Sequence, residues 1–232
     1  SRGVFGGQYG SVTTIDYIAI ATTGNATDFG DLSQGRGTME ATSDGVRGIF
    51  AGGTTGSNPG DIVNTIDYIT IATTGNATDF GDLTNAVEGA GSASDGSRGI
   101  FAVGQGNPST TTIDYITIAT PGNGTVFGNM ARTRRHLGGA SDGSRGVFGG
   151  GFSSTYTHRE LEFVTISTPN NATDFGELLS LSLTQVSATS NGPRGVWGGG
   201  YVTTDIGYIT IATLANAIYF GDLTIGRSGH GA

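Results

Sequence analysis

Apolar and polar residues follow a strand-like pattern in a segment that recurs five times along the chain. The most regular copy spans residues 65–73, and the others begin at residues 14, 112, 160 and 205. By the two-residue period of a strand, Ile66, Tyr68 and Ala72 share one face, while Ile69 and Ile71 share the other. A sheet with one solvated face alternates apolar and polar residues, whereas both faces here are largely apolar. The pattern predicts sheets that pack against neighbours on both sides.

Each repeat opens with Arg-Gly, a β-branched residue and an aromatic residue. The repeated arginines are 45, 51, 47 and 49 residues apart, near the ~40–50 residues of a β-propeller blade. We expect an all-β fold, a five-bladed β-propeller of four-stranded antiparallel blades that forms a single domain over residues 1–232. A β-sandwich and a trimeric fibre are the alternatives. The expected units start near residues 1, 46, 97, 144 and 193.

Four strands are expected in each unit. In the first they cover residues 3–7, 15–22, 28–32 and 36–43. Thr23-Gly24-Asn25 and Asp44-Gly45 supply the turn residues between them. Because the chain starts at the second strand of a unit, we expect residues 228–232 to pair beside residues 3–7, so that the C-terminal strand closes the ring on the N-terminal blade.

Composition and charge narrow both the class of protein and the kinds of partner that we expect. The chain has 43 glycines among 232 residues, but only 13% of its residues are charged, which favours an ordered β protein over a disordered one. Its net charge is −8 and its eleven basic residues are all arginines, so we expect no nucleic-acid partner. The one local basic group is Arg132, Arg134, Arg135 and His136.

The absence of cysteine excludes disulfides, thiolate metal sites and cysteine nucleophiles. No apolar run approaches the ~20 residues that span a bilayer, and no signal segment opens the chain. Since the chain begins with Ser1 rather than Met, we expect it to be processed or to be one piece of a longer polypeptide.

Several short motifs have structural explanations that outweigh the chemical ones. Asp-Phe-Gly at residues 28–30 and 79–81 lacks the lysine that a kinase needs. Four Asn-x-Thr sequences, at Asn25, Asn76, Asn123 and Asn171, suit tight turns as well as glycosylation. The Asp-Gly pairs are turns rather than calcium sites, because calcium needs about six oxygen ligands. We expect no metal and no cofactor.

No catalytic set stands out either. The three histidines, His136, His158 and His230, lie in different units, and no Ser/His/Asp arrangement is recognisable. Glu160 and Glu162 share one strand face without identifiable partners. We expect no enzyme, although carboxylates that converge in a pocket would favour one.

The repeated arginines are expected to be structural. An arginine beside a turn satisfies backbone carbonyls or pairs with a carboxylate such as Asp28, Asp79 or Asp174. Five equivalent ligand sites are the alternative. These arginines are Arg2, Arg47, Arg98, Arg145 and Arg194.

The two ends of each expected blade differ in their sequence variation. The Asp-Gly and Thr-Gly-Asn turns change little between units and lie at one end. The connections at residues 8–12, 54–64, 105–111, 152–159 and 201–204 vary in length and content, and lie at the other. Variable loops on a rigid scaffold often carry binding residues, although ordinary solvated loops would look the same. The candidate ligand-binding residues on these loops are Tyr9, Tyr156, His158, Arg159 and Tyr201.

The repeat resembles the kelch repeat of β-propellers. The paired glycines Gly149-Gly150, the strand residue Tyr68 and the later aromatic Phe80 occupy the corresponding places, with Phe80 where kelch repeats usually have Trp. Kelch-type copper oxidases need a cysteine ligand, so that activity does not carry over. The sequence of residues 67–83 is also similar to repeats in virion structural proteins of marine tailed phages. This similarity implies a component of a phage particle.

These observations lead to one main functional hypothesis and two rivals. We expect a non-catalytic, virion-associated and hence extracellular propeller of a phage fibre, tail or capsid decoration. It would bind a host surface glycan or other virion proteins through its variable loops. The rivals are a purely structural spacer without ligand and a polysaccharide-processing enzyme.

Overall fold

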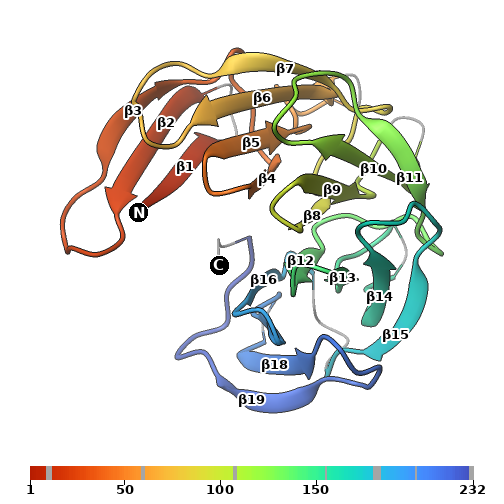
Figure 1. Ribbon diagram of the computed structural model, residues 1–232. Coiled ribbons are helices and arrows are strands. Elements are labelled where there is room, and N and C mark those ends of the chain that lie inside the picture. The colour runs from red at the N-terminus through yellow and green to blue at the C-terminus, as the bar shows by residue number, and fades with distance from the viewer. Residues whose placement is uncertain are drawn as a thin grey trace.

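The five repeated segments fold into five antiparallel sheets that stand side by side around a common centre. In the computed structural model, Figure 1 shows the first sheet in red and orange and the last in blue, with the others between them in chain order. The fold is an all-β, five-bladed propeller, as the repeat spacing predicts, and no α-helix occurs in the described residues. The structure describes residues 1–8, 12–58, 61–106, 109–154, 156–179, 184–201 and 203–229.

Each blade is built from one inner strand and the three strands that follow it in sequence; the first blade has three strands in all. The first blade contains β1 (Arg2–Gln8), β2 (Val12–Ala19) and β3 (Thr27–Asp31). The second contains β4 (Glu40–Ser43), β5 (Arg47–Ala51), β6 (Thr65–Thr70) and β7 (Thr78–Asp82). The third contains β8 (Gly91–Ser94), β9 (Arg98–Ala102), β10 (Thr112–Thr117) and β11 (Thr125–Asn129). The fourth contains β12 (Gly138–Ser141), β13 (Arg145–Gly149), β14 (Glu160–Thr165) and β15 (Thr173–Glu177). The fifth contains β16 (Ser187–Ser190), β17 (Arg194–Gly198), β18 (Asp205–Thr210) and β19 (Ile218–Asp222).

The strand order within each sheet follows the chain, as in β4-β5-β6-β7. Since every neighbouring pair is antiparallel, the Asp-Gly turn and the Thr-Gly-Asn turn lie at one end of a blade, which we call the turn end. The connection between the second and third strands of a blade and the link to the next blade lie at the other, the variable-loop end. This arrangement agrees with the prediction from the sequence.

A β-bulge recurs between the last two strands of each blade. In the second blade the register of β6 and β7 shifts between Ile66 and Asp67, opposite Gly81. Gly81 has φ +139°, and a Cβ there would lie 2.7 Å from the backbone of Gly122 in the next blade. The glycine of the Phe-Gly-Asp motif is therefore required by conformation and by the close approach of the neighbouring blade.

The hydrophobic core is divided into four clusters, one between each pair of successive blades. The two faces of β6 enter different clusters: Ile69 packs toward the first blade, and Ile66 packs toward the third. The prediction of a sheet buried on both faces is confirmed for the second blade, with Ile66 fully buried and Ile69 2% exposed. Ala72 lies beyond the strand and is exposed.

Two of the four predicted strands differ from the observed bounds by more than one residue. The second strand of the first blade runs from Val12 to Ala19 rather than over residues 15–22. Of the strand predicted at residues 36–43, only Glu40–Ser43 is regular. The preceding residues form a link in which the Arg36 side chain is buried and Thr38 has φ +52°, a conformation outside a strand.

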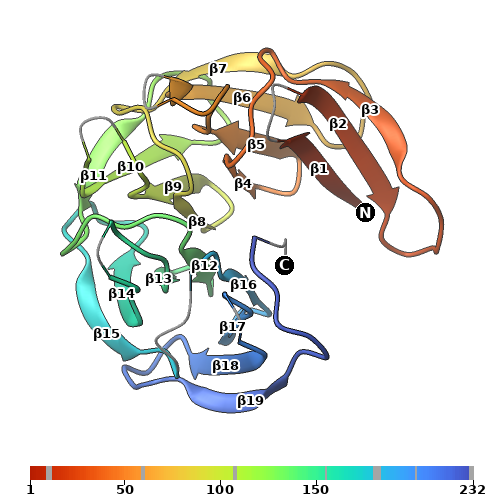
Figure 2. The ribbon, with the colours of Figure 1, turned by 180° about the vertical axis from the view of Figure 1, so that it is seen from behind.

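The predicted pairing of residues 228–232 with residues 3–7 is only partly within the described chain. Residues 230–232 lie outside it, and the described Ser228 and Gly229 add no strand to the sheet of β1, β2 and β3. Gly229 instead donates its N–H to the carbonyl of Gln185. Figures 1 and 2 show the N-terminus and the segment after β19 facing the same opening between the first and last sheets.

Within the described part of the chain, no helix is long and apolar enough to cross a membrane.

Candidate functional site

The turn end of the second to fifth blades contacts the preceding blade. The side-chain Oδ1 of Asn76 accepts a hydrogen bond from the Asp31 N–H of the blade before it, at 3.1 Å. Asn123, Asn171 and Asn216 accept equivalent bonds at 3.0–3.1 Å from the ends of β7, β11 and β15. Three of the four Asn-x-Thr asparagines, together with Asn216 at the equivalent position, thus join successive blades.

The repeated arginines join blades at the same end. Arg47 Nη1 donates to the carbonyl of Ile118 in the next blade at 3.0 Å, and the guanidinium lies 5.0 Å from the ring centre of Tyr68 in its own blade. Of the two structural roles expected, carbonyl binding is the one observed. No ion pair to a carboxylate is found for these arginines in the described residues. Arg2, Arg98 and Arg145 repeat both contacts, and Arg194 repeats the ring contact with Tyr208.

The Asp-Gly pairs are hydrogen-bonded turns. Asp44 Oδ1 accepts from the N–H groups of Val46 and Arg47 at 2.8 and 2.6 Å. Asp95 does the same with Ser97 and Arg98. Among the described residues, no three His, Asp or Glu side chains come together as metal ligands.

Buried charged side chains, which were not predicted from the sequence, lie in the interior near the variable-loop end. Arg36 Nη1 lies 2.9 Å from Asp67 Oδ2, and both side chains are fully buried. Arg36 also donates from Nε to the Gly52 carbonyl, and Ser33 donates to both oxygens of Asp67. The ion pair therefore joins the link between the first and second blades to the middle of β6.

The equivalent position differs in the next two blades. In the third, Val87 replaces the arginine, and Asp114 is held by the N–H and the hydroxyl of Thr84; burial raises the pKa of Asp114. In the fourth, Arg134 Nη2 lies 2.9 Å from the longer Glu162. Arg134 Nε is buried without a hydrogen-bond partner, unlike Arg36 Nε.

Glu40 lies on the inner strand β4, where Ser92 of the next blade donates to its carboxylate. Burial by the surrounding strands raises the pKa of Glu40 to about 8, against the lowering effect of hydrogen bonds from Ser92 and the Ala41 N–H. The carboxyl group therefore favours its neutral form near pH 7.

This shift predicts a pH dependence of stability. The ordinary pKa is 4.5 and the folded pKa is about 8, so between these values the folded state holds a proton that the unfolded state releases. The free energy of unfolding should therefore fall as pH rises from about 5 to 8. Glu40→Gln should remove this component, of order 1 kcal/mol after allowance for the partial exposure of the side chain. Urea unfolding of both proteins at pH 5 and pH 8 checks this, and parallel pH profiles would contradict it.

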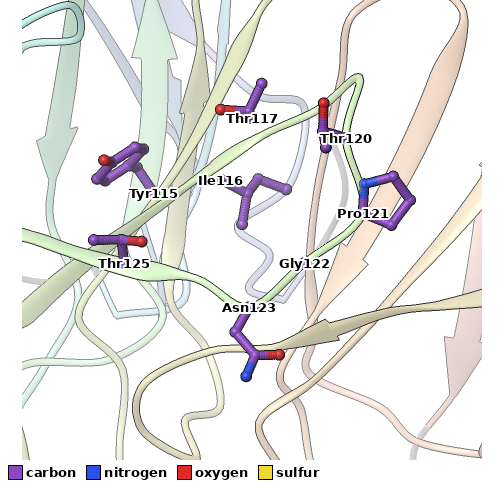
Figure 3. Close-up of a pocket in the computed structure, with 8 residues that line it drawn as sticks. All are labelled: Tyr115, Ile116, Thr117, Thr120, Pro121, Gly122, Asn123 and Thr125. Atoms are coloured by element: carbon purple, nitrogen blue, oxygen red, sulfur yellow. The ribbon is translucent and has the colours of Figure 1, made fainter.

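A hollow of about 340 Å³ lies inside the hairpin between β10 and β11. Figure 3 shows Thr117, Thr120 and Pro121 along its loop, with the Asn123 side chain turned away from them. That direction agrees with the hydrogen bond that Asn123 accepts from Asp82. The lining carries no carboxylate or histidine, and the equivalent turns of the second, fourth and fifth blades likewise bind the preceding blade.

A smaller hollow of about 140 Å³ at the variable-loop end is lined by charged side chains. It lies between the link that follows β11 and the first half of β14. Glu162 is buried and bound by Arg134 and the Ala131 N–H. Burial tends to raise the pKa of Glu160, but its own N–H, His158 and Arg134 outweigh this and lower it. The lining residues are Ala131, Arg132, Arg134, Glu160, Glu162, Ala172 and Asp174.

The predicted ligand-binding residues do not line this hollow, and they differ in how exposed they are. Tyr156 and Tyr201 are 70% and 68% exposed, on the loops of two adjacent blades. Arg159 is half exposed and paired with Glu177 at 2.6 Å. His158 is only 4% exposed, with its ring nitrogens 3.1 Å from Ser153 Oγ and 3.3 Å from Glu160 Oε2, so it supports the loop from beneath. Tyr9 lies outside the described residues.

Comparison with known proteins gives no family: no protein-family model and no curated protein matches the chain.

Proposed function

We propose that this chain is a non-catalytic propeller that binds a surface glycan through its variable-loop end. The observation that carries the proposal is the contrast between its two ends. The turn end is used for hydrogen bonds between blades, whereas the variable-loop end presents Tyr156 and Tyr201 to solvent on neighbouring blades. Exposed aromatic side chains on a rigid scaffold are suited to recognition, because they bury a large area at small entropic cost.

The variable-loop end also supplies polar groups. Arg132, Glu160 and Asp174 line the smaller hollow there, where they can exchange hydrogen bonds with hydroxyl groups. His158 fixes the loop that carries Tyr156 by its contacts to Ser153 and Glu160, which limits the entropy lost on binding. Exposed aromatic surface and hydrogen-bonding groups at one end of the propeller are the two kinds of contact that a sugar ring requires.

The proposed biological setting rests on the resemblance of the repeat sequence to kelch-like repeats and to repeats of phage virion proteins. We propose that the propeller is displayed on a phage fibre, tail or capsid, where the glycan belongs to the host surface. Contact with another virion protein through the same loops is the other form of this hypothesis. Mass spectrometry of purified particles, with this chain sought among their components, tests the setting separately from the binding.

The double variant Tyr156→Ala/Tyr201→Ala is expected to lose glycan affinity by at least about tenfold, since truncation of aromatic contacts commonly costs more than 1 kcal/mol each. A glycan array identifies the ligand, and titration calorimetry with that glycan measures the loss. Phe5→Ala is the matched control, an exposed aromatic residue on β1 of the first blade, and it should bind normally. Equal affinity of the double variant, or an array on which the native chain binds nothing, would refute the proposal.

Polysaccharide hydrolysis is the second candidate, because Glu160, Glu162 and Asp174 line one hollow. Glycosidases need one carboxyl group whose pKa is raised so that it can protonate the leaving group. The lowered pKa of Glu160 and the ion pair between Glu162 and Arg134 oppose this role. Release of reducing ends from the array-identified glycan, abolished by Glu160→Gln, would favour the enzyme instead.

A further inference from the structure

The contacts between successive blades repeat so closely that each blade has two defined faces. On its forward face, a blade presents the arginine that opens its second strand, the phenylalanine of Phe-Gly-Asp, and a backbone N–H at the end of its outer strand. On its rear face, it presents the aromatic residue of its second strand, an isoleucine carbonyl and an asparagine Oδ1. Between the first and second blades, for example, Arg2 donates to the Ile71 carbonyl and Asp31 N–H to Asn76.

Within the described residues, no blade packs on the forward face of the last blade. Phe220 is 57% exposed, whereas Phe175 at the same place in the fourth blade is 3% exposed. The Arg194 guanidinium lies over Tyr208 but has no carbonyl acceptor in a following blade among the described residues. Asp222 likewise has no following asparagine, unlike Glu177, which donates to Asn216.

The rear face of the first blade is open in the complementary way. Phe5 is 58% exposed, whereas Phe148 at the same place in the fourth blade is fully buried. Ile20 is 61% exposed, whereas Ile166, whose carbonyl accepts from Arg98, is fully buried. Asn25 is exposed at the position where Asn76 accepts its hydrogen bond.

The segment after β19 resembles the links that precede the third and fourth blades. Gly229 donates its N–H to the Gln185 carbonyl with φ +64°. The same contact runs from Gly89 to Thr38 and from His136 to Gly89, each residue having φ between +52° and +61°. In both of those cases the next residues open the inner strand of a blade.

We propose that these two faces are docking surfaces for further blades of the same repeat, which complete the ring. The occupant is a four-stranded sheet that offers an isoleucine carbonyl and an asparagine Oδ1 to the last blade, and an opening arginine and a Phe-Gly-Asp motif to the first. The two faces are complementary, because each group that lacks its usual partner on one face corresponds to a partner group that is exposed on the other. The inference is independent of the proposed glycan binding.

Two other occupants fit less well. Direct closure of the last blade on the first would require sharper rotation between blades, yet the arginine-to-carbonyl distances at the four interfaces are uniform at 2.8–3.1 Å. Figures 1 and 2 show the sheets stopping short of a full circle at this spacing. A second copy of the chain would place five more blades at this opening, which is already bordered by the first blade of the chain itself.

Amide hydrogen exchange of the chain as it stands gives the first test. The Glu177 N–H, bound to Asn216, should exchange at least about tenfold more slowly than the Asp222 N–H, which has no such acceptor. Equal protection of the two amides in a monomeric sample would mean that the ring closes on itself and would overturn the proposal. Equal protection in a dimer, identified by analytical ultracentrifugation, would mean that a second copy covers the face and would overturn it too.

An extended chain gives the second test. In sequence, Gly231-Ala232 aligns with Gly91-Ser92, so a second copy of residues 93–130 appended after Ala232 should build one further blade. The Asp222 N–H should then become protected by tenfold or more. Phe220→Ala should leave the urea midpoint of the 232-residue chain nearly unchanged but lower that of the extended chain, as Phe175→Ala does in both. An Asp222 amide that stays unprotected in the extended chain, or a Phe220→Ala variant that is neutral in it, would overturn the proposal.

Discussion

Replacement of Phe148 with alanine is expected to lower the free energy of unfolding by about 3–5 kcal/mol, the usual cost of deleting a buried phenylalanine side chain. Phe148 is fully buried between the third and fourth blades and packs in the cluster that contains Phe127 and Met130. The surrounding side chains come from two sheets whose spacing is fixed by hydrogen bonds between blades, so the cavity has little freedom to collapse. Urea denaturation followed by circular dichroism measures the loss.

The repeat provides a matched control for this substitution. Phe5 occupies the same place in the first blade and is 58% exposed, so Phe5→Ala should cost less than about 1 kcal/mol. The same chemical change at two equivalent sites thus separates burial from strand propensity. Losses of equal size at the two sites would show that the phenylalanine acts through its own strand rather than through the interface.

Replacement of Arg36 with methionine is expected to cost about 3–5 kcal/mol, because it leaves the Asp67 carboxylate buried without its counter-charge. Both side chains are fully buried, and Arg36 also satisfies the carbonyls of Gly52 and Phe50. Methionine retains most of the packing volume, so the loss reports mainly on charge and hydrogen bonding. The free energy of unfolding at pH 7 checks the prediction.

A double-mutant cycle supplies the control for this effect. If the uncompensated carboxylate dominates the loss, Arg36→Met/Asp67→Asn should be more stable than Arg36→Met alone. In the third blade, where Val87 replaces the arginine and burial raises the pKa of the aspartate, Asp114→Asn should cost less than Asp67→Asn. If Arg36→Met is as stable as the native chain, the pair contributes no net stability.

The architecture was predictable because one sequence pattern carries it in every copy. Apolar residues on both faces of the segment around Ile66 and Ile69 required neighbours on two sides, and the spacing of the arginines fitted one blade per repeat. The repeated asparagines and arginines were recognised as turn residues, but their acceptors and donors lie in adjacent blades about 40–70 residues away. Contacts at such separations are set by how sheets stack, which a single repeat does not encode.

The buried charges were missed for a related reason. Asp67 sits between apolar strand residues, where period-two reasoning assigns it to a face but cannot tell which neighbour it meets. Arg36 was assigned to a strand, so its burial against that aspartate was not expected. The recurrence of a carboxylate at Asp67, Asp114 and Glu162 was the available signal.

The variable-loop end was predictable in location but not in detail. Tyr156 and Tyr201 are exposed, whereas His158 lies under its loop with both ring nitrogens engaged. Sequence variation identifies a loop but does not tell which of its side chains point outward. That depends on short contacts within the loop, such as the one between His158 and Ser153.

Trp197 is the one tryptophan of the chain, and it lies 1% exposed between the fourth and fifth blades, with Nε1 donating to the Gly138 carbonyl. Its emission spectrum therefore reports on a single interface, while far-ultraviolet dichroism averages over all the sheets. A row of blades that contact only their neighbours can lose structure from one end before the other. Any offset between the two optical signals during denaturation would locate the cooperative boundary relative to that interface, with no label added to the molecule.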